Sequence, residues 1–252
     1  MALLLRSSWP ALALVLAVAT VPARGEDQPA AAVKPAFACP DDMVPIPGGS
    51  FLFQGKKLAV KDFCLDSTKV TAEMYMECVD HDKCTDEGMY DGSWRTYALH
   101  DDHPINYVNW KQAVAYCEAR GHRLPTEVEW EWAARGGPAA NPYPWGSEPP
   151  KDQLCWSGPG NDAPGGKRTG TCPVLEYPKG ATPQGILDMV GNVYEWTASA
   201  APHGKRIIRG ACWGTRRPEH ISSRHREPAD PSKGDFLNGF RCAGKPSPQL
   251  GR

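Results

Sequence analysis

Long hydrophobic runs and an excess of one charge are both missing from this chain of 252 residues. Its apolar run, from Ala11 to Val21, has about half of the roughly 20 residues that a transmembrane helix needs, which argues against a retained membrane anchor. The formal net charge of −1 gives no attraction to nucleic acid or to an anionic membrane. Internal repeats, a P-loop, a dinucleotide fingerprint and a Ser/His/Asp nucleophile signature are also missing, which removes the functions that depend on them.

The N-terminal segment has the features of a secretory signal peptide in the usual order. Arg6 precedes the apolar run, and residues 23–25 form a small-x-small cleavage site. We therefore expect residues 1–25 to be a signal peptide and the protein to be exported, to the periplasm or the extracellular space. Cleavage removes two of the 28 Lys and Arg residues and none of the 29 Asp and Glu residues, so the mature chain has a formal charge of −3.

Cysteine and turn-forming residues are plentiful. Nine cysteines in an exported chain indicate disulfides, and the odd number leaves at least one thiol unpaired. Spacing alone does not choose among the roughly 105 pairings of eight cysteines, although Cys78 and Cys84 are near enough to close a small loop. With 25 Gly, 25 Pro and nine Trp, the composition is typical of one loop-rich globular domain.

Periodicity and capping residues predict a mixture of short strands and short helices. Alternating segments at 43–53 and 61–70 are typical of strands. Thr71 is the expected cap of a helix over 72–79, and two later helices begin at capping boxes. The capping boxes pair Asn109 with Gln112 and Thr126 with Glu129, and the two helices are expected to stop at Gly121 and Gly136. Ordered loops are expected over 85–102 and 137–184, the second of them held by Trp145 and Trp156. Further strands are expected over 205–213 and 238–244.

The sequence "HDDH" at 100–103 contains residue types that ligate metals. His103 precedes a proline in a stretch without any period, so a loop of solvated charges is the favoured interpretation.

Several segments together resemble one known family. They are "MVPIPGGSF", "FCLDSTKVTAEMY", "HPINYVNWKQAVAYCEARGHRLPTEVEWEWAARGG", "YPWG", "GILDMVGNVYEWT", "RIIRGACW" and "NGFRCAG", in order from Met43 to Cys242. This pattern is similar to the formylglycine-generating enzyme or sulfatase-modifying-factor family. The resemblance implies a single mixed α/β (α+β) domain with little regular secondary structure, related to C-type lectins. We place it at 43–243, after a Pro/Ala-rich lead at 26–42 and before a tail at 244–252.

The resemblance also implies that one part of the family's chemistry is absent. Family enzymes bind copper through two cysteines downstream of an "R-G-G-S" turn, because soft thiolates suit copper(I). Here the turn reads "RGAC", with Cys212 at the serine position and no cysteine in "WGTRRPEHISSRHRE". Copper is therefore not expected. Cys212 is the one candidate catalytic residue, alone or with His220 or His225 in a mixed copper site, but an inert buried thiol is favoured.

The arginines after this turn offer planar donors for an anion. Trp213, Arg216, Arg224 and Arg226 are the expected pocket residues. Arg217 is a further candidate for this pocket. For all four arginines, exposure to solvent or bonding to backbone is at least as good an interpretation.

Calcium is the cofactor that the resemblance implies. Asn192 and Glu195 in "VGNVYEW" supply hard oxygen ligands, so chelation is expected to lower the melting temperature. At a second family calcium site the alignment places Leu154 and Gly166, which cannot replace the expected Asn and Asp ligands. We infer that a disulfide between Cys155 and Cys172 replaces that ion.

The resemblance gives the remaining disulfides. "AYC" and "GFRC" match two family segments that a disulfide joins, which implies a bond between Cys117 and Cys242. The set is completed by Cys78 with Cys84, Cys155 with Cys172, and Cys39 with Cys64, which leaves Cys212 as a free thiol.

The expected function is that of an exported binding module for a peptide, a glycan or an envelope protein, without copper-dependent cysteine oxidation. The alternative is an active oxygen-dependent oxidoreductase of the formylglycine-generating type, acting on a protein cysteine or a small thiol. A purely structural envelope protein is the third possibility.

Overall fold

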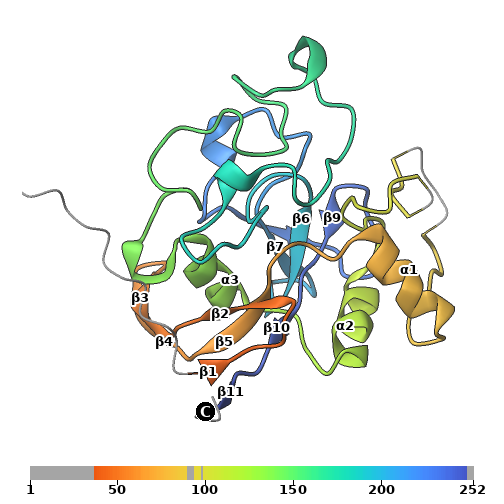
Figure 1. Ribbon diagram of the computed structural model, residues 1–252, viewed down its shortest axis with the longest axis horizontal. Coiled ribbons are helices and arrows are strands. Elements are labelled where there is room, and N and C mark those ends of the chain that lie inside the picture. The colour runs from red at the N-terminus through yellow and green to blue at the C-terminus, as the bar shows by residue number, and fades with distance from the viewer. Residues whose placement is uncertain (1–36, 90–93, 98, 249–252) are drawn as a thin grey trace, which may run out of the picture. The chain divides into compact units, whose positions relative to one another are not determined.

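The computed structural model describes residues 37–89, 94–97 and 99–248 (Figure 1). The expected signal peptide at 1–25 and most of the lead lie outside these residues. Strand β1 (Phe37–Ala38) pairs with β11 (Ser247–Pro248). The folded unit therefore extends beyond both expected boundaries, 43 and 243. None of the described helices is long and apolar enough to cross a membrane.

Local capping forms the three α-helices of the described residues. Their bounds are α1 (Ala72–Asp80), α2 (Trp110–Ala119) and α3 (Glu127–Ala134). Thr71 caps α1, accepting from the backbone of Met74 at 3.2 Å. Helices α2 and α3 both begin with reciprocal capping boxes, at the residues that the sequence predicts. These side chains satisfy backbone donors that have no partner inside the helix.

The strands form small sheets. The first has the order β10-β5-β2, with β2 (Met43–Ile46), β5 (Phe63–Asp66) and β10 (Ala243–Gly244) antiparallel. A separate hairpin pairs β3 (Gly49–Phe53) with β4 (Lys56–Val60). Its turn is formed by Gln54 and Gly55, both at positive φ, as a tight hairpin requires. Strand β4 lies outside the segments that the sequence pattern predicts as strands.

The sheet that carries the candidate site has the order β8-β7-β6-β9. It contains β6 (Tyr194–Ala200), β7 (Arg206–Arg209), β8 (Arg226–Ala229) and β9 (Asn238–Gly239). Only the β6–β9 pairing is parallel. Helix α3 packs against β6 and β7 (Figure 1).

Residues 137–184 are irregular, as the sequence predicts, apart from the short 3₁₀ turns η1 (Gly137–Ala139), η2 (Pro164–Gly166) and η3 (Pro178–Gly180). A fourth such turn, η4 (Pro218–His220), follows β7. Trp156 anchors the irregular region because its ring is fully buried and its Nε1 donates to the carbonyl of Lys151 at 2.7 Å.

All nine cysteines lie in the described residues. Four disulfides join Cys39 to Cys64, Cys78 to Cys84, Cys117 to Cys242, and Cys155 to Cys172. Cys212 is free and buried. These are the pairs that the sequence analysis expects, and the Cys117–Cys242 bond ties α2 to the segment before β10.

Candidate functional site

The turn that contains Cys212 is fixed by its backbone. Strand β7 ends at Arg209, and Gly210 and Ala211 then take φ values of 95° and 62°. A Cβ at Gly210 would lie 2.5 Å from the carbonyl oxygen of Met189, so only glycine fits there. The backbone of Gly191 donates to the carbonyl of Gly210 at 2.7 Å, which clamps the turn to the "VGN" loop.

The Cys212 thiol lies beneath the surface, with 4% of the residue exposed. Its Sγ is 3.6 Å from Thr215 Oγ1. Burial raises the pKa of the thiol, and the hydrogen bonds from Thr215 and Gly214 lower it by less. Because a thiolate is the form that binds copper(I) or attacks an electrophile, this setting disfavours both.

Glu195, an expected calcium ligand, is completely buried and surrounded by cations. Its Oε1 accepts from Lys69 Nζ at 2.5 Å and from Arg241 Nη2 at 3.0 Å. Its Oε2 accepts from Trp130 Nε1 and from Arg241 Nε, both at 2.8 Å. Burial raises the pKa of Glu195, but Arg241 and Lys69 together lower it more, so the group stays ionised.

Asn192, the other expected ligand, uses its side-chain amide to bind the backbone of Cys172. Its Oδ1 accepts from the backbone of Cys172 at 3.1 Å, while its Nδ2 donates to the carbonyl of Cys172 at 2.9 Å. The second amide hydrogen goes to Asp188 Oδ2 at 3.1 Å. These bonds fasten the Cys155–Cys172 disulfide to the "VGN" loop.

Calcium at this motif remains a prediction, and the contacts argue against it. The buried ammonium of Lys69 lies 2.7 Å from the carbonyl oxygen of Asp188 and against the Glu195 carboxylate. A hard cation would need those same oxygens. The side chains present therefore fit an internal lysine better than an ion.

The expected pocket residues are only partly brought together. Arg224 and Arg226 line a pocket of about 380 Å³, with Arg135 and Glu131 beside them. Trp213 instead packs against Phe236, with a ring-centroid distance of 6.1 Å. The side chain of Arg216 is exposed.

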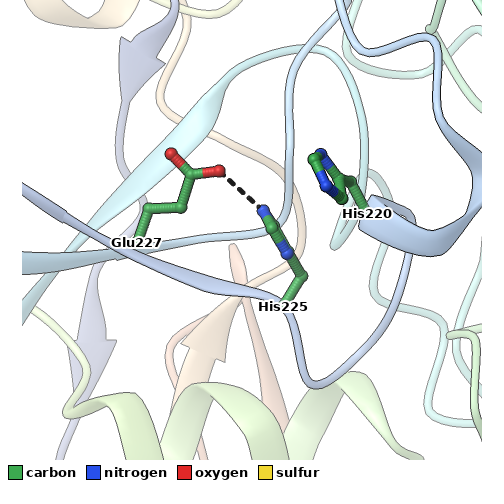
Figure 2. Close-up of side chains that lie close together, drawn as sticks. All are labelled: His220, His225 and Glu227. Atoms are coloured by element: carbon green, nitrogen blue, oxygen red, sulfur yellow. Dashed lines mark hydrogen bonds and ion pairs between the residues drawn. The ribbon is translucent and has the colours of Figure 1, made fainter.

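A cluster of possible metal ligands lies next to this region. One ligand atom each from His220, His225 and Glu227 lies within 4.8 Å of the others (Figure 2). His220 ends η4, His225 immediately precedes β8, and Glu227 lies in β8. The two imidazole rings are stacked at 4.8 Å, and His225 Nε2 is 2.9 Å from Glu227 Oε1.

From the sequence, the two histidines are expected only as partners of Cys212, and Glu227 is not among the predicted site residues. A signal was available, because residues two apart along an extended segment face the same side, as His225 and Glu227 do. Tyr194 completes the cluster by donating its hydroxyl to Glu227 Oε1 at 3.1 Å. Burial lowers the pKa of His225, outweighing the opposite effect of Glu227, which favours the neutral imidazole.

The "HDDH" segment differs from the loop of solvated charges that the sequence predicts. Asp101 and Asp102 are exposed, but the side chain of His103 is only 13% exposed. His103 Nδ1 lies 2.7 Å from Thr171 Oγ1, and its ring stacks on His100 at 4.4 Å. Burial and the neighbouring His100 lower the pKa of His103 to about 4.

Comparison with known proteins identifies the family and the fold. The family model of the sulfatase-modifying factor enzyme 1-like domain matches residues 29–246. The "Inactive C-alpha-formylglycine-generating enzyme 2" of Bos taurus is 41% identical over 162 residues, which cover 58% of this chain and 53% of that protein. The formylglycine-generating enzyme of Thermomonospora curvata is 37% identical over 174 residues, covering 58% and 56%. The chain thus spans about half the length of these relatives. The crystal structure of CarF has the same fold, with a TM-score of 0.67 at 20% identity, covering 82% of this chain and 98% of that one.

Proposed function

The chain belongs to the sulfatase-modifying factor enzyme 1-like domain family, and from this premise we propose that it is an exported binding protein without copper-thiolate oxidase chemistry. One observation carries the proposal: eight of the nine cysteines are joined in disulfides, and the ninth, Cys212, is buried. Two thiolates are needed to hold copper(I) in near-linear coordination. The disulfides leave a single thiol for that purpose.

Relatives do not settle the activity by name, since one is called inactive and another is named as an enzyme. Export is supported by the disulfides, which persist in oxidising compartments and not in the cytosol.

The arginine pocket favours an acidic peptide as the ligand. Three arginines, Arg135, Arg224 and Arg226, line it with one carboxylate, Glu131. That carboxylate is already neutralised, because Arg209 lies 2.8 Å from one oxygen and Arg135 lies 3.3 Å from the other. Arg226 is itself paired with Glu127 at 2.9 Å. Four arginines thus meet two carboxylates in and beside the pocket, so its excess charge is positive, and guanidinium groups match carboxylates in two-point hydrogen bonding.

An oxidation assay tests the first half of the proposal. The mature protein is supplied with copper(I), oxygen and a sulfatase-type cysteine peptide, and aldehyde formation is followed by mass spectrometry. We expect no more aldehyde from the wild type than from Cys212→Ser. Catalytic turnover that Cys212→Ser abolishes would replace the proposal with the oxidase alternative.

Peptide binding tests the second half. A fluorescent hexaglutamate peptide is expected to bind, and Arg224→Gln is expected to weaken it about fivefold, the upper range for one exposed ion pair. Arg216→Gln is the matched control, because that arginine is also exposed and does not line this pocket. Equal loss in both variants, or equal binding of hexaglutamine, would contradict a specific acidic site.

A further inference from the structure

We propose that His220, His225 and Glu227 form a binding site for one divalent transition-metal ion. The observation behind it is the convergence of two imidazoles and one carboxylate from η4, the segment before β8, and β8 itself (Figure 2). The three ligands of this site are not among the residues that line the acidic-peptide pocket, and Cys212 is not one of them. The site adds a metal function that the proposed function does not contain.

The distances are close to those of a formed site. Nitrogen and oxygen ligands lie about 2.0–2.2 Å from zinc, so two adjacent ligands of one ion are roughly 3 Å apart. His225 Nε2 and Glu227 Oε1, 2.9 Å apart, already have that separation. His220 is the farther ligand, since the three atoms span up to 4.8 Å. Two ligands of one ion are at most about 4.2 Å apart, so His220 has to leave its stack on His225 and move closer when the ion binds.

The surroundings hold these ligands in place. Tyr194 donates to the same carboxylate oxygen that faces His225, at 3.1 Å, and thereby orients Glu227 as outer-shell groups do in metal sites. The side chain of His225 is 15% exposed and that of Glu227 is 43% exposed, so an ion can enter from solvent.

Neighbouring charges do not prevent binding of a cation. Arg209 is the nearby guanidinium that acts on His225. It is itself compensated by Glu131, at 2.8 Å, and by Glu127, at 3.7 Å. Arg226, the cation on β8, is paired with Glu127 at 2.9 Å. Both guanidinium groups are thus already paired with carboxylates other than Glu227.

The ligand set selects the kind of metal. Imidazole ligands suit zinc, iron and similar ions, whereas calcium and magnesium prefer all-oxygen sets. Two histidines and one carboxylate leave further positions open, as in the facial triad of non-haem iron proteins. The site is thus suited to zinc or ferrous iron with solvent or an anionic ligand in the remaining positions.

Cobalt(II) titration tests the site. The mature protein, without a polyhistidine tag and with its disulfides intact, is stripped with chelator and titrated with cobalt(II), followed by its visible absorption. We expect one equivalent to bind and zinc to displace it. His225→Ala and Glu227→Gln should each weaken binding by more than about 100-fold, beyond the roughly 10–100-fold typical of losing an outer-shell partner, as in Tyr194→Phe.

The chain supplies a matched control. His100 and His103 are a second stacked pair of imidazoles, at 4.4 Å, outside the site. His100→Ala with His103→Ala should leave cobalt binding unchanged, and so should Cys212→Ser. Unfolding curves confirm that each variant is folded. The proposal is overturned if the wild type shows no saturable binding, if the control pair abolishes it, or if Cys212→Ser removes it. The oxidation and peptide assays have separate readouts, so failure of the metal site and failure of the proposed function can be told apart.

Discussion

Lys69→Met removes an ammonium group from the interior and tests whether this lysine occupies the place of a cation. Lys69 is fully buried, and its Nζ contacts Glu195 Oε1 at 2.5 Å and the Asp188 carbonyl at 2.7 Å. In the variant, Arg241 is the remaining cation against Glu195. Asp188 also loses a stabilising partner. Burial raises the pKa of Asp188 to about 6, and the charge of Lys69 opposes that rise.

Two independent estimates of the cost agree. A hydrogen bond to a charged group contributes about 1.5–3 kcal/mol, so the two bonds of Lys69 contribute roughly 3–6 kcal/mol. Removing one partner of a buried ion pair costs about 3–5 kcal/mol. We expect a loss near 4 kcal/mol, which for a domain of this size lowers the melting temperature by roughly 10 °C.

Urea and thermal unfolding measure this loss. Lys179→Met is the matched control, because Lys179 makes an ion pair with Asp152 at 2.7 Å but its side chain is 71% exposed. Solvent screens that pair, so the control should show no measurable change. Calcium added to the metal-free wild type should leave its melting temperature unchanged. If the two variants lose equal stability, or if calcium stabilises the wild type, the reasoning about Lys69 is wrong.

Other perturbations give separate tests. Burial lowers the pKa of His103 from its ordinary 6.5 to about 4, so its contribution to stability is complete above pH 6.5 and is lost as the pH falls towards 4. In His103→Asn the urea midpoint of unfolding should therefore depend less on pH between 4 and 6.5. The same pH dependence in the variant and the wild type would contradict the assignment. Replacing Cys117 and Cys242 by Ala opens a loop with a sequence separation of 125 and should cost about 5 kcal/mol, against about 2 kcal/mol for the Cys78–Cys84 loop with a separation of 6. Equal losses would show that loop length does not set the effect. Cys212→Ser should change stability by less than about 1 kcal/mol because Thr215 offers a hydrogen-bond partner, and the wild-type thiol should react with iodoacetamide only slowly unless denatured.

Strands were the least predictable part of the fold. β8 is an edge strand with the sequence "REPA", which has no apolar alternation, and Pro228 is tolerated there because an edge strand leaves backbone donors unpaired. β6 begins inside the motif that the sequence analysis assigned to calcium. In both cases the pairing partner, and not local propensity, makes the segment a strand.

The sequence by itself determined what depends on neighbours along the chain or on order-preserving motifs. Helix caps are set by a side chain and a backbone group three residues apart, as in Thr126 with Glu129, and so can be read locally. The run of family motifs likewise implied the fold and the disulfide pairs. Tertiary structure alone decided which buried charge meets which. Lys69 and Glu195 are 126 residues apart. Nothing near either residue in the sequence shows that the ammonium of Lys69 will contact the Glu195 and Asp188 oxygens that a metal ion would need. The contact arises because a charge removed from water must find an opposite charge within hydrogen-bonding distance, and only the packed fold determines where that charge is.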